Sequence, residues 1–225
     1  MSLIRTIRSL RFELFYWWQT RGGLPLVTLG KECQWTLSDR GLGPESRVLC
    51  AGAGHDISFE KALIDAYGCR VVLLDPSPTG VATVAREALS EEKLRFLPLG
   101  LSDTDGELEF QEPAEAEEGS FRSATASGIA TRRFPCKSLP TLMQEWRWPQ
   151  IDLLKIDIEG AEFGVLRQIV EQRVLVRQIC VELHHGPQFG RSRMESVRAI
   201  LGLRRAGYDL VHRFQWDHTF LRRGG

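Results

Sequence analysis

The chain has 225 residues, of which 43% are hydrophobic and 26% are charged, and this length suits one α/β domain with a well-buried core. Its 29 basic and 29 acidic residues leave no formal net charge. That balance argues against a general nucleic-acid binder, which must neutralise many phosphates. No segment approaches the roughly 18 continuous apolar residues of a membrane span. The five scattered cysteines, without a C-x-x-C pair, indicate reduced thiols in a cytoplasmic protein.

The first 27 residues predict a helical lead-in to a domain that spans residues 28–225. Residues 3–18 can form an amphipathic helix with Arg5, Arg8 and Arg11 at helical intervals. We expect this helix to pack on the domain or on a partner subunit. The alternative is peripheral contact with an anionic membrane surface, which suits a basic helix rich in aromatic residues.

From residue 47 onward, apolar strand-like runs alternate with helix-like stretches, a pattern typical of a mostly parallel sheet with helices on both faces. The sequence therefore predicts a Rossmann-like α/β fold. Residues 111–135 show no periodicity and predict a lid or an insertion. The expected strands cover residues 47–51, 70–74, 94–99, 107–110, 151–156, 176–183, 209–214 and 218–221, and the expected helices cover 56–67, 79–89, 138–146, 161–172 and 193–206.

A glycine loop, Gly52-Ala53-Gly54, follows the first buried strand and precedes a helix. Glycine at such a turn lets the backbone approach a ligand closely, and the helix N-terminus offers unpaired N–H groups. The third glycine of the dinucleotide pattern is absent, since Ile57 stands in its place. Asp56 would repel a pyrophosphate, so the loop favours a cofactor that lacks phosphates and carries positive charge.

Asp75 and Pro76 follow the second strand, about twenty residues beyond the glycine loop. In a Rossmann-like domain this position reaches the ribose hydroxyls of a nucleoside, for which a carboxylate is a good bidentate acceptor. The alternative role for Asp75 is to cap the strand end before Pro76. The loop, the spacing and the carboxylate together favour nucleoside binding.

The segment that follows the strand at 151–156 carries the densest group of charges. Lys155, Asp157 and Glu159 alternate along the chain, so their side chains share one face. This face opens at the carboxyl edge of the sheet, where open α/β sheets bind ligands. A simple salt-bridged strand end is the alternative, but several charges in an apolar strand are costly without a function.

Glu182, His184 and His185 end the fifth parallel strand, and Glu182 should reach the same edge as Asp157 and Glu159. The three carboxylates could bind a divalent metal, or Glu159, Glu182 or His184 could act as a general base towards a hydroxyl. Adjacent histidines point to opposite faces of an extended chain, so at most one of the two enters the site.

The chain resembles the FkbM family of methyltransferases, and the fourth-strand motif is the most specific part of that match. The resemblance implies the class I methyltransferase fold, a seven-stranded sheet whose last strand is antiparallel, with S-adenosylmethionine over the first two strand ends. The stretches that carry it are Cys33–Leu37, Gly52–Glu60, Gly68–Pro76, Leu99–Asp103, Ile151–Glu162 and Asp217–Arg222.

The same resemblance implies roles for individual residues. Gly52, Ala53 and Gly54 would line the methionine part of the cofactor, and Asp75 with Pro76 the ribose. Ser102 and Asp103 would lie near the adenine, and Asp157 near the transferred methyl group. Cys50 stands where many class I methyltransferases carry an acid that touches the cofactor's amino group, so that contact falls to another residue such as Asp56.

These observations predict a methyltransferase that uses S-adenosylmethionine to methylate a hydroxyl of a sugar, lipid or small metabolite, with residues 111–135 as a substrate lid. The catalytic candidates are Lys155, Asp157, Glu159, Glu182 and His184. The expected partner is a small-molecule or glycan acceptor. The alternatives are an NAD-dependent oxidoreductase or epimerase, and a binding protein without catalytic activity.

Overall fold

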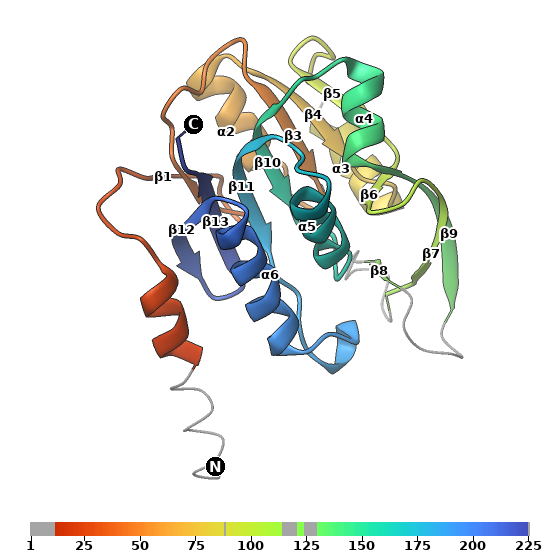
Figure 1. Cartoon of the computed structure of the whole chain (residues 1–225). Helices are drawn as coiled ribbons and strands as arrows, with labels where there is room; N and C mark the ends of the chain where they lie inside the picture. The colour runs from red at the N-terminus through yellow and green to blue at the C-terminus, as the bar shows by residue number, and fades with distance from the viewer. Residues whose placement is uncertain (1–11, 88, 114–120, 124–129, 225) are drawn as a thin grey trace.

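The computed structural model describes residues 12–87, 89–113, 121–123 and 130–224. Its central sheet has seven strands in the order β12-β13-β11-β10-β3-β4-β5, and β13 runs antiparallel to both neighbours (Figure 1). The expected Rossmann-like sheet with an antiparallel last strand is thus confirmed. The strands are β3 (Arg47–Ala51), β4 (Arg70–Leu74), β5 (Leu94–Leu97), β10 (Ile151–Ile156), β11 (Val176–Glu182), β12 (Tyr208–Phe214) and β13 (Asp217–Arg222).

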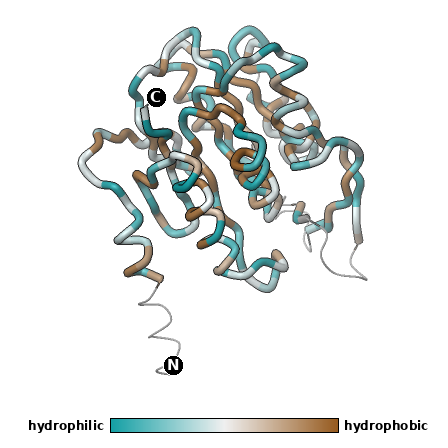
Figure 2. Tube along the Cα trace, viewed as in Figure 1, coloured by the Kyte–Doolittle hydropathy of each residue, from teal (hydrophilic) through white to brown (hydrophobic). Residues whose placement is uncertain are grey.

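Helices cover both faces of this sheet because its strands are apolar on both sides. Along β3, Leu49 and Ala51 pack with α4 to α6, whereas Val48 and Cys50 pack with α2 on the other face. Hydrophobic residues accordingly concentrate in the central strands (Figure 2). The helices are α2 (Ser58–Tyr67), α3 (Pro78–Glu87), α4 (Leu139–Trp146), α5 (Glu162–Glu171) and α6 (Arg193–Arg205).

Two short strands that the sequence does not predict, β1 (Val27–Leu29) and β2 (Trp35–Leu37), form an antiparallel pair. Trp35 is 2% exposed and Leu37 is fully buried, and both belong to the cluster on the α2 face. This pair therefore brings the chain before residue 38 onto the sheet, beside the glycine loop. A 3₁₀ turn, η2 (Pro187–Phe189), follows β11.

A second, four-stranded sheet corrects the expectation that residues 111–135 lack regular structure. β7 (Gly106–Gln111) pairs with both β8 (Arg122–Ser123) and β9 (Thr131–Ser138), and β9 also pairs with β6 (Gly100–Ser102). Phe134, Cys136 and Ser138 of β9 are buried at alternate positions, a period that Pro135 and the neighbouring charges conceal in the sequence. Residues 114–120 and 124–129 of the expected lid lie outside the described residues.

Residues 12–19 are helical, while residues 3–11 of the predicted helix lie outside the described part. Tyr16 is buried against the core, and the Arg21 N–H donates to the Leu210 carbonyl of β12 at 2.7 Å. This helix therefore packs on the domain. Within the described residues, no helix has both the length and the apolar character needed to span a bilayer.

Candidate functional site

A cavity of about 330 Å³ opens at the carboxyl edge of the main sheet. It lies over the ends of β3, β4 and β10, where parallel α/β sheets bind their ligands. We refer to it as the glycine-loop cavity. It is lined by Glu32, Cys33, Gly52, Ala53, Gly54, His55, Asp56, Leu74, Asp75, Pro76, Ser77, Gly100, Leu101, Phe110, Phe121, Lys155, Asp157, Ile158 and Glu159.

The loop after β3 requires glycine at position 52. Gly52 has a φ of +92°, and a Cβ there would stand 1.9 Å from the Asp157 carbonyl oxygen. The loop is held against the neighbouring strands, because the Gly52 N–H donates to Leu74 O and the Asp157 N–H to Ala51 O, both at 2.9 Å. Only glycine permits this approach of two backbones, and the result is a cavity floor made of main chain.

The buried carboxylate of Asp75 organises that floor. One oxygen, Oδ2, accepts the N–H groups of Ala53 at 2.8 Å and Gly54 at 3.2 Å, and Oδ1 accepts the N–H of Ser77 at 2.8 Å. Since a carboxylate oxygen offers two lone pairs, only Oδ1 keeps one for a ligand. Asp75 can therefore accept one hydroxyl in this geometry, rather than two as the sequence suggests, while Pro76 forms part of the wall beside it.

Asp56 lines the cavity and ties the glycine loop to the segment before β2. Its carboxylate accepts the N–H groups of Cys33 and Ser58, each at 2.8 Å, and the Ser58 hydroxyl at 2.7 Å. Burial alone raises the pKa of Asp56, but these hydrogen bonds outweigh it and lower the pKa overall. A negative charge is thus fixed at the helix end of the loop.

Lys155 of β10 is 2% exposed and lies beneath the same loop. Its Nζ donates to the Gly52 carbonyl at 2.5 Å and lies 3.9 Å from Asp157 Oδ2. Burial lowers the pKa of Lys155, but the charges of Asp157 and of the buried Glu60 outweigh it, so the pKa is raised and the ammonium persists. Lys155 therefore positions the loop and Asp157 from below.

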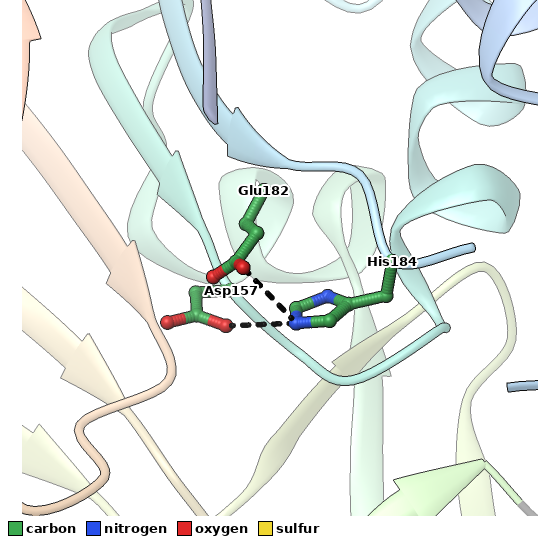
Figure 3. A group of neighbouring side chains, drawn as sticks. All are labelled: Asp157, Glu182 and His184. Atoms are coloured by element: carbon green, nitrogen blue, oxygen red, sulfur yellow. Dashed lines mark ion pairs between the residues drawn. The ribbon is translucent and has the colours of Figure 1, made fainter. Parts of the chain in front are cut away.

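His184 stands at the centre of an acidic cluster that β10 and β11 bring together (Figure 3). Its Nε2 lies 3.9 Å from Asp157, 3.7 Å from Glu159 and 3.6 Å from Glu182. We call these three carboxylates and His184 the acidic cluster. Asp157 and Glu159 also line the glycine-loop cavity, so the cluster forms part of the cavity wall.

The charges of the acidic cluster shift the pKa values of its members. Burial and the charge of Asp157 raise the pKa of Glu182 to about 8. Burial lowers the pKa of His184, but a hydrogen bond between its Nδ1 and the fully buried Glu162, with the surrounding carboxylates, raises it to about 10. A raised pKa favours the imidazolium form of His184 at neutral pH, and this form is a poorer general base than the neutral imidazole.

Glu159 occupies the tight turn that follows β10. Its φ of +54° is unusual for a residue with a side chain, and Gly160 beside it has a φ of +103°. Such conformations cost free energy and tend to occur where a side chain must be aimed at a ligand. Here the turn keeps Glu159 on the cavity wall after the strand itself has ended at Ile156.

The structure separates the two adjacent histidines. His184 faces the acidic cluster, whereas the Nδ1 of His185 lies 3.1 Å from the Ser196 hydroxyl of α6. Burial lowers the pKa of His185. Only one of the pair therefore lies in the site, which is the arrangement expected for neighbouring residues of an extended chain.

Ser102 and Asp103 do not line the glycine-loop cavity. They border a second cavity of about 590 Å³ between β7, α5 and α6. There Asp103 accepts a hydrogen bond from Arg167 at 2.9 Å, and its backbone carbonyl accepts one from Gln168. Gly100 and Leu101, which directly precede Ser102, line the glycine-loop cavity instead.

Sequence reasoning assigned no role to Glu60 or Glu162, which are 1% and 0% exposed. Glu60 lies below the cavity near Cys50 and Lys155, and Glu162 holds His184. Each lies in the first turn of a helix that follows a strand of the site, and this position is the signal in the sequence that could have identified them as site residues. Phe110 of β7 and Phe121, which directly precedes β8, also line the cavity.

Comparison with known proteins gives a family match and similar solved structures. Residues 49–210 match the model of the methyltransferase FkbM domain. Among solved structures, a Methanococcus jannaschii fibrillarin pre-rRNA processing protein has a TM-score of 0.45 at 11% identity, with 82% of this chain and 69% of that chain covered. For an Aeropyrum pernix fibrillarin with natively bound S-adenosyl-L-methionine the TM-score is 0.42 at 12% identity, with the same coverage. No curated protein matches the sequence. The family match extends over most of the chain, which belongs to the FkbM family of S-adenosylmethionine-dependent methyltransferases.

Proposed function

We propose that this protein transfers the methyl group of S-adenosylmethionine to a hydroxyl of a sugar, lipid or other small acceptor. The observation that carries the proposal is the shared wall of the glycine-loop cavity and the acidic cluster. Asp157 and Glu159 belong to both, so a cofactor in the cavity and a hydroxyl at the cluster would lie side by side.

The residues of the glycine-loop cavity suit S-adenosylmethionine. The cofactor carries a sulfonium and an ammonium group, and the carboxylates of Asp56, Asp157 and Glu159 face the space that would hold them. The single lysine of the wall is already bound to the Gly52 carbonyl. A dinucleotide pyrophosphate would meet these carboxylates without a cation to balance it, which disfavours NAD. The apolar side chains of Leu101 and Phe110 offer a surface for the adenine.

When bound, S-adenosylmethionine supplies a methyl group activated by its positive sulfur. The chain supplies position and charge, which are what an in-line displacement requires. Glu159 would accept the proton of the acceptor hydroxyl as the hydroxyl oxygen bonds to the methyl carbon, and the electrons of the broken carbon–sulfur bond would stay on sulfur. We assign this role to Glu159 because its strained turn holds it on the cavity wall. Asp157 orients the reacting groups from beside it.

Aromatic side chains next to the acidic cluster favour a cyclic acceptor such as a sugar. The Phe189 and Trp216 rings lie 4.8 and 5.8 Å from the His184 ring, measured between centroids, and 5.9 Å from each other. Trp216 is only partly buried, so its face can stack on a ring of the acceptor. The hydroxyls of that ring would then point at carboxylate acceptors.

A methyl-transfer screen with radiolabelled S-adenosylmethionine tests this function against glycans, lipids and small hydroxylated metabolites. We expect the wild type to label a hydroxylated acceptor, and Glu159→Gln to bind the cofactor but transfer about 10²–10⁴-fold more slowly. Glu45→Gln, at an exposed site on the opposite edge of the sheet, is the matched control. Cofactor binding without transfer to any acceptor would favour a binding protein, and stabilisation by NAD alone an oxidoreductase.

A further inference from the structure

We propose that Asp157, Glu182 and His184 hold a divalent metal ion at the wall of the glycine-loop cavity. One ligand atom from each of these residues lies within 4.8 Å of the other two (Figure 3). They come from the ends of two adjacent parallel strands, β10 and β11, so the sheet itself fixes their spacing. The set differs from the three carboxylates that the sequence suggests, because His184 takes the place of Glu159.

The separations within the group suit ligands of one ion. His184 Nε2 lies 3.9 Å from Asp157 Oδ1 and 3.6 Å from Glu182 Oε1, which is too long for hydrogen bonds. Two ligand atoms that each lie about 2.1–2.2 Å from a metal at ordinary coordination angles are about 3.0–3.8 Å apart. Small side-chain shifts would therefore bring all three into coordination.

The orientation of His184 supports the same assignment independently of the carboxylates. Its side chain is 5% exposed, and its Nε2 is aimed into the group without a hydrogen bond to any described residue. The opposite nitrogen, Nδ1, is held by Glu162, which is fully buried. A carboxylate that fixes one imidazole nitrogen so that the other can bind a metal is a recurring arrangement in metal sites.

The donors indicate the kind of ion. A nitrogen ligand beside two carboxylates suits Mn²⁺ or a neighbouring transition metal better than Ca²⁺ or Mg²⁺, which prefer oxygen alone. Three protein ligands leave coordination positions open. Since Asp157 lines the glycine-loop cavity, an open position would face the acceptor hydroxyl and make its proton easier to remove. That catalytic role rests on the proposed function, whereas the metal site itself does not.

Titration of chelator-treated protein with Mn²⁺, followed by electron paramagnetic resonance, tests the site without any methyl transfer. We expect one ion per chain in the wild type. His184→Gln and Glu182→Gln should bind at least about 100-fold more weakly, and Glu162→Gln, which removes only the positioning bond, about 10–100-fold more weakly. His185→Gln is the control, because it removes a neighbouring imidazole that faces Ser196. Circular dichroism verifies that each variant is folded.

Failure of the folded wild-type protein to bind Mn²⁺ would overturn the metal site. Equal binding by the wild type and the His184 and Glu182 variants would overturn it as well. Calorimetry with S-adenosylmethionine in the absence of metal separates this result from a failure of the proposed function. Cofactor binding without Mn²⁺ binding rejects the metal site alone, and the reverse result rejects the cofactor assignment alone.

We further infer that the helical segment at residues 12–19 docks on an anionic lipid surface. Leu14, Trp17 and Trp18 lie on one side of this helix and are 59%, 74% and 75% exposed. The other side is fixed to the domain through Tyr16, which is buried, and the salt bridge of Glu13 to Arg213 at 2.8 Å adds a second tie.

The positive charge of this part of the sequence favours an anionic bilayer as the binding partner of the helix. Residues 1–23 contain four arginines and one glutamate; the glutamate pairs with Arg213, and one of the arginines, Arg21, pairs with Asp209 at 2.7 Å. Tryptophan is favoured at the boundary between water and lipid, and arginines beside it attract anionic headgroups. A basic segment with exposed tryptophans thus fits a membrane surface.

Co-sedimentation with phosphatidylcholine vesicles, with and without phosphatidylserine, tests the lipid surface. We expect binding only to the anionic vesicles, and its loss in the double variant Trp17→Ser, Trp18→Ser. Leu175→Ser is the control: Leu175 is a 41% exposed leucine outside the helical segment, so its replacement should leave vesicle binding unchanged. Equal binding by the double variant would overturn the inference. A concentration-dependent dimer that the same double variant abolishes would overturn it too, because the aromatic face would then belong to a second copy of the chain.

Discussion

Replacing Asp75 with asparagine tests how one carboxylate builds the floor of the cofactor cavity. Both of its oxygens accept backbone N–H groups, from Ala53 and Gly54 at Oδ2 and from Ser77 at Oδ1. An asparagine amide has only one acceptor oxygen, so its NH₂ group must face an N–H donor in either orientation. The less costly orientation keeps the bonds to Ala53 and Gly54 and gives up the bond to Ser77.

The loss of one hydrogen bond to a charged group should destabilise the fold by about 1.5–3 kcal/mol. For a chain of this size, each kcal/mol corresponds to a fall in Tm of about 2–4 °C. Asp75→Ala, which abandons all three donors, should cost more than Asp75→Asn. Because the glycine loop forms the cavity floor, both variants should also bind S-adenosylmethionine more weakly, in the same order.

Thermal and urea denaturation, followed by circular dichroism, measure the stability of these variants. Asp65→Asn is the matched control, because Asp65 is an exposed acid on α2 and its replacement should change stability by less than about 0.5 kcal/mol. If Asp75→Asn were as stable as the wild type, or Asp75→Ala no less stable than Asp75→Asn, the carboxylate would not organise the loop.

Further predictions concern backbone geometry, pH and capping. Denaturation should show a cost of at least about 3 kcal/mol for Gly52→Ala, which collides with a carbonyl, but about 1–2 kcal/mol for Gly54→Ala, which has a φ of +51° and open space. Burial lowers the pKa of His218 from 6.5 to about 3, so the neutral imidazole contributes a folding stability that is complete above pH 6.5 and is lost as pH falls towards 3. Unfolding free energies measured over this pH range should fall less steeply for His218→Phe than for the wild type. Ser192→Ala, which removes the capping box of α6, should lower the free energy of unfolding, measured by urea denaturation, by about 1 kcal/mol.

The main sheet could be predicted from the sequence because its strands are buried apolar runs. All six residues of β10 are buried, and β3, β4 and β10 have the bounds that the sequence predicts. Local signals fixed several helix ends as well. Gly68 ends α2 in the left-handed conformation, and the Ser138 side chain caps α4. The pairing of β1 with β2 could not be predicted, because three-residue strands are too short to show a period.

For the site, topology could be predicted but local geometry could not. Parallel strands end at one edge, so the meeting of Asp157 with Glu182 follows from their places in the sequence. The hydrogen bond between Glu162 and His184 depends on how α5 starts beneath β11, which no periodicity encodes. Asp103 pairs with Arg167 of α5, which is 64 positions away in the sequence, and this pairing directs the Asp103 side chain to the second cavity.

The most direct test of the central claim is a calorimetric titration of the folded wild-type chain with S-adenosylmethionine, repeated with Gly52→Ala. The glycine-loop cavity predicts saturable binding of one cofactor per chain, lost in the variant because a Cβ at residue 52 would stand 1.9 Å from the Asp157 carbonyl. Absence of binding to the folded wild type, or undiminished binding to a folded Gly52→Ala, would contradict the assignment of this cavity to the cofactor.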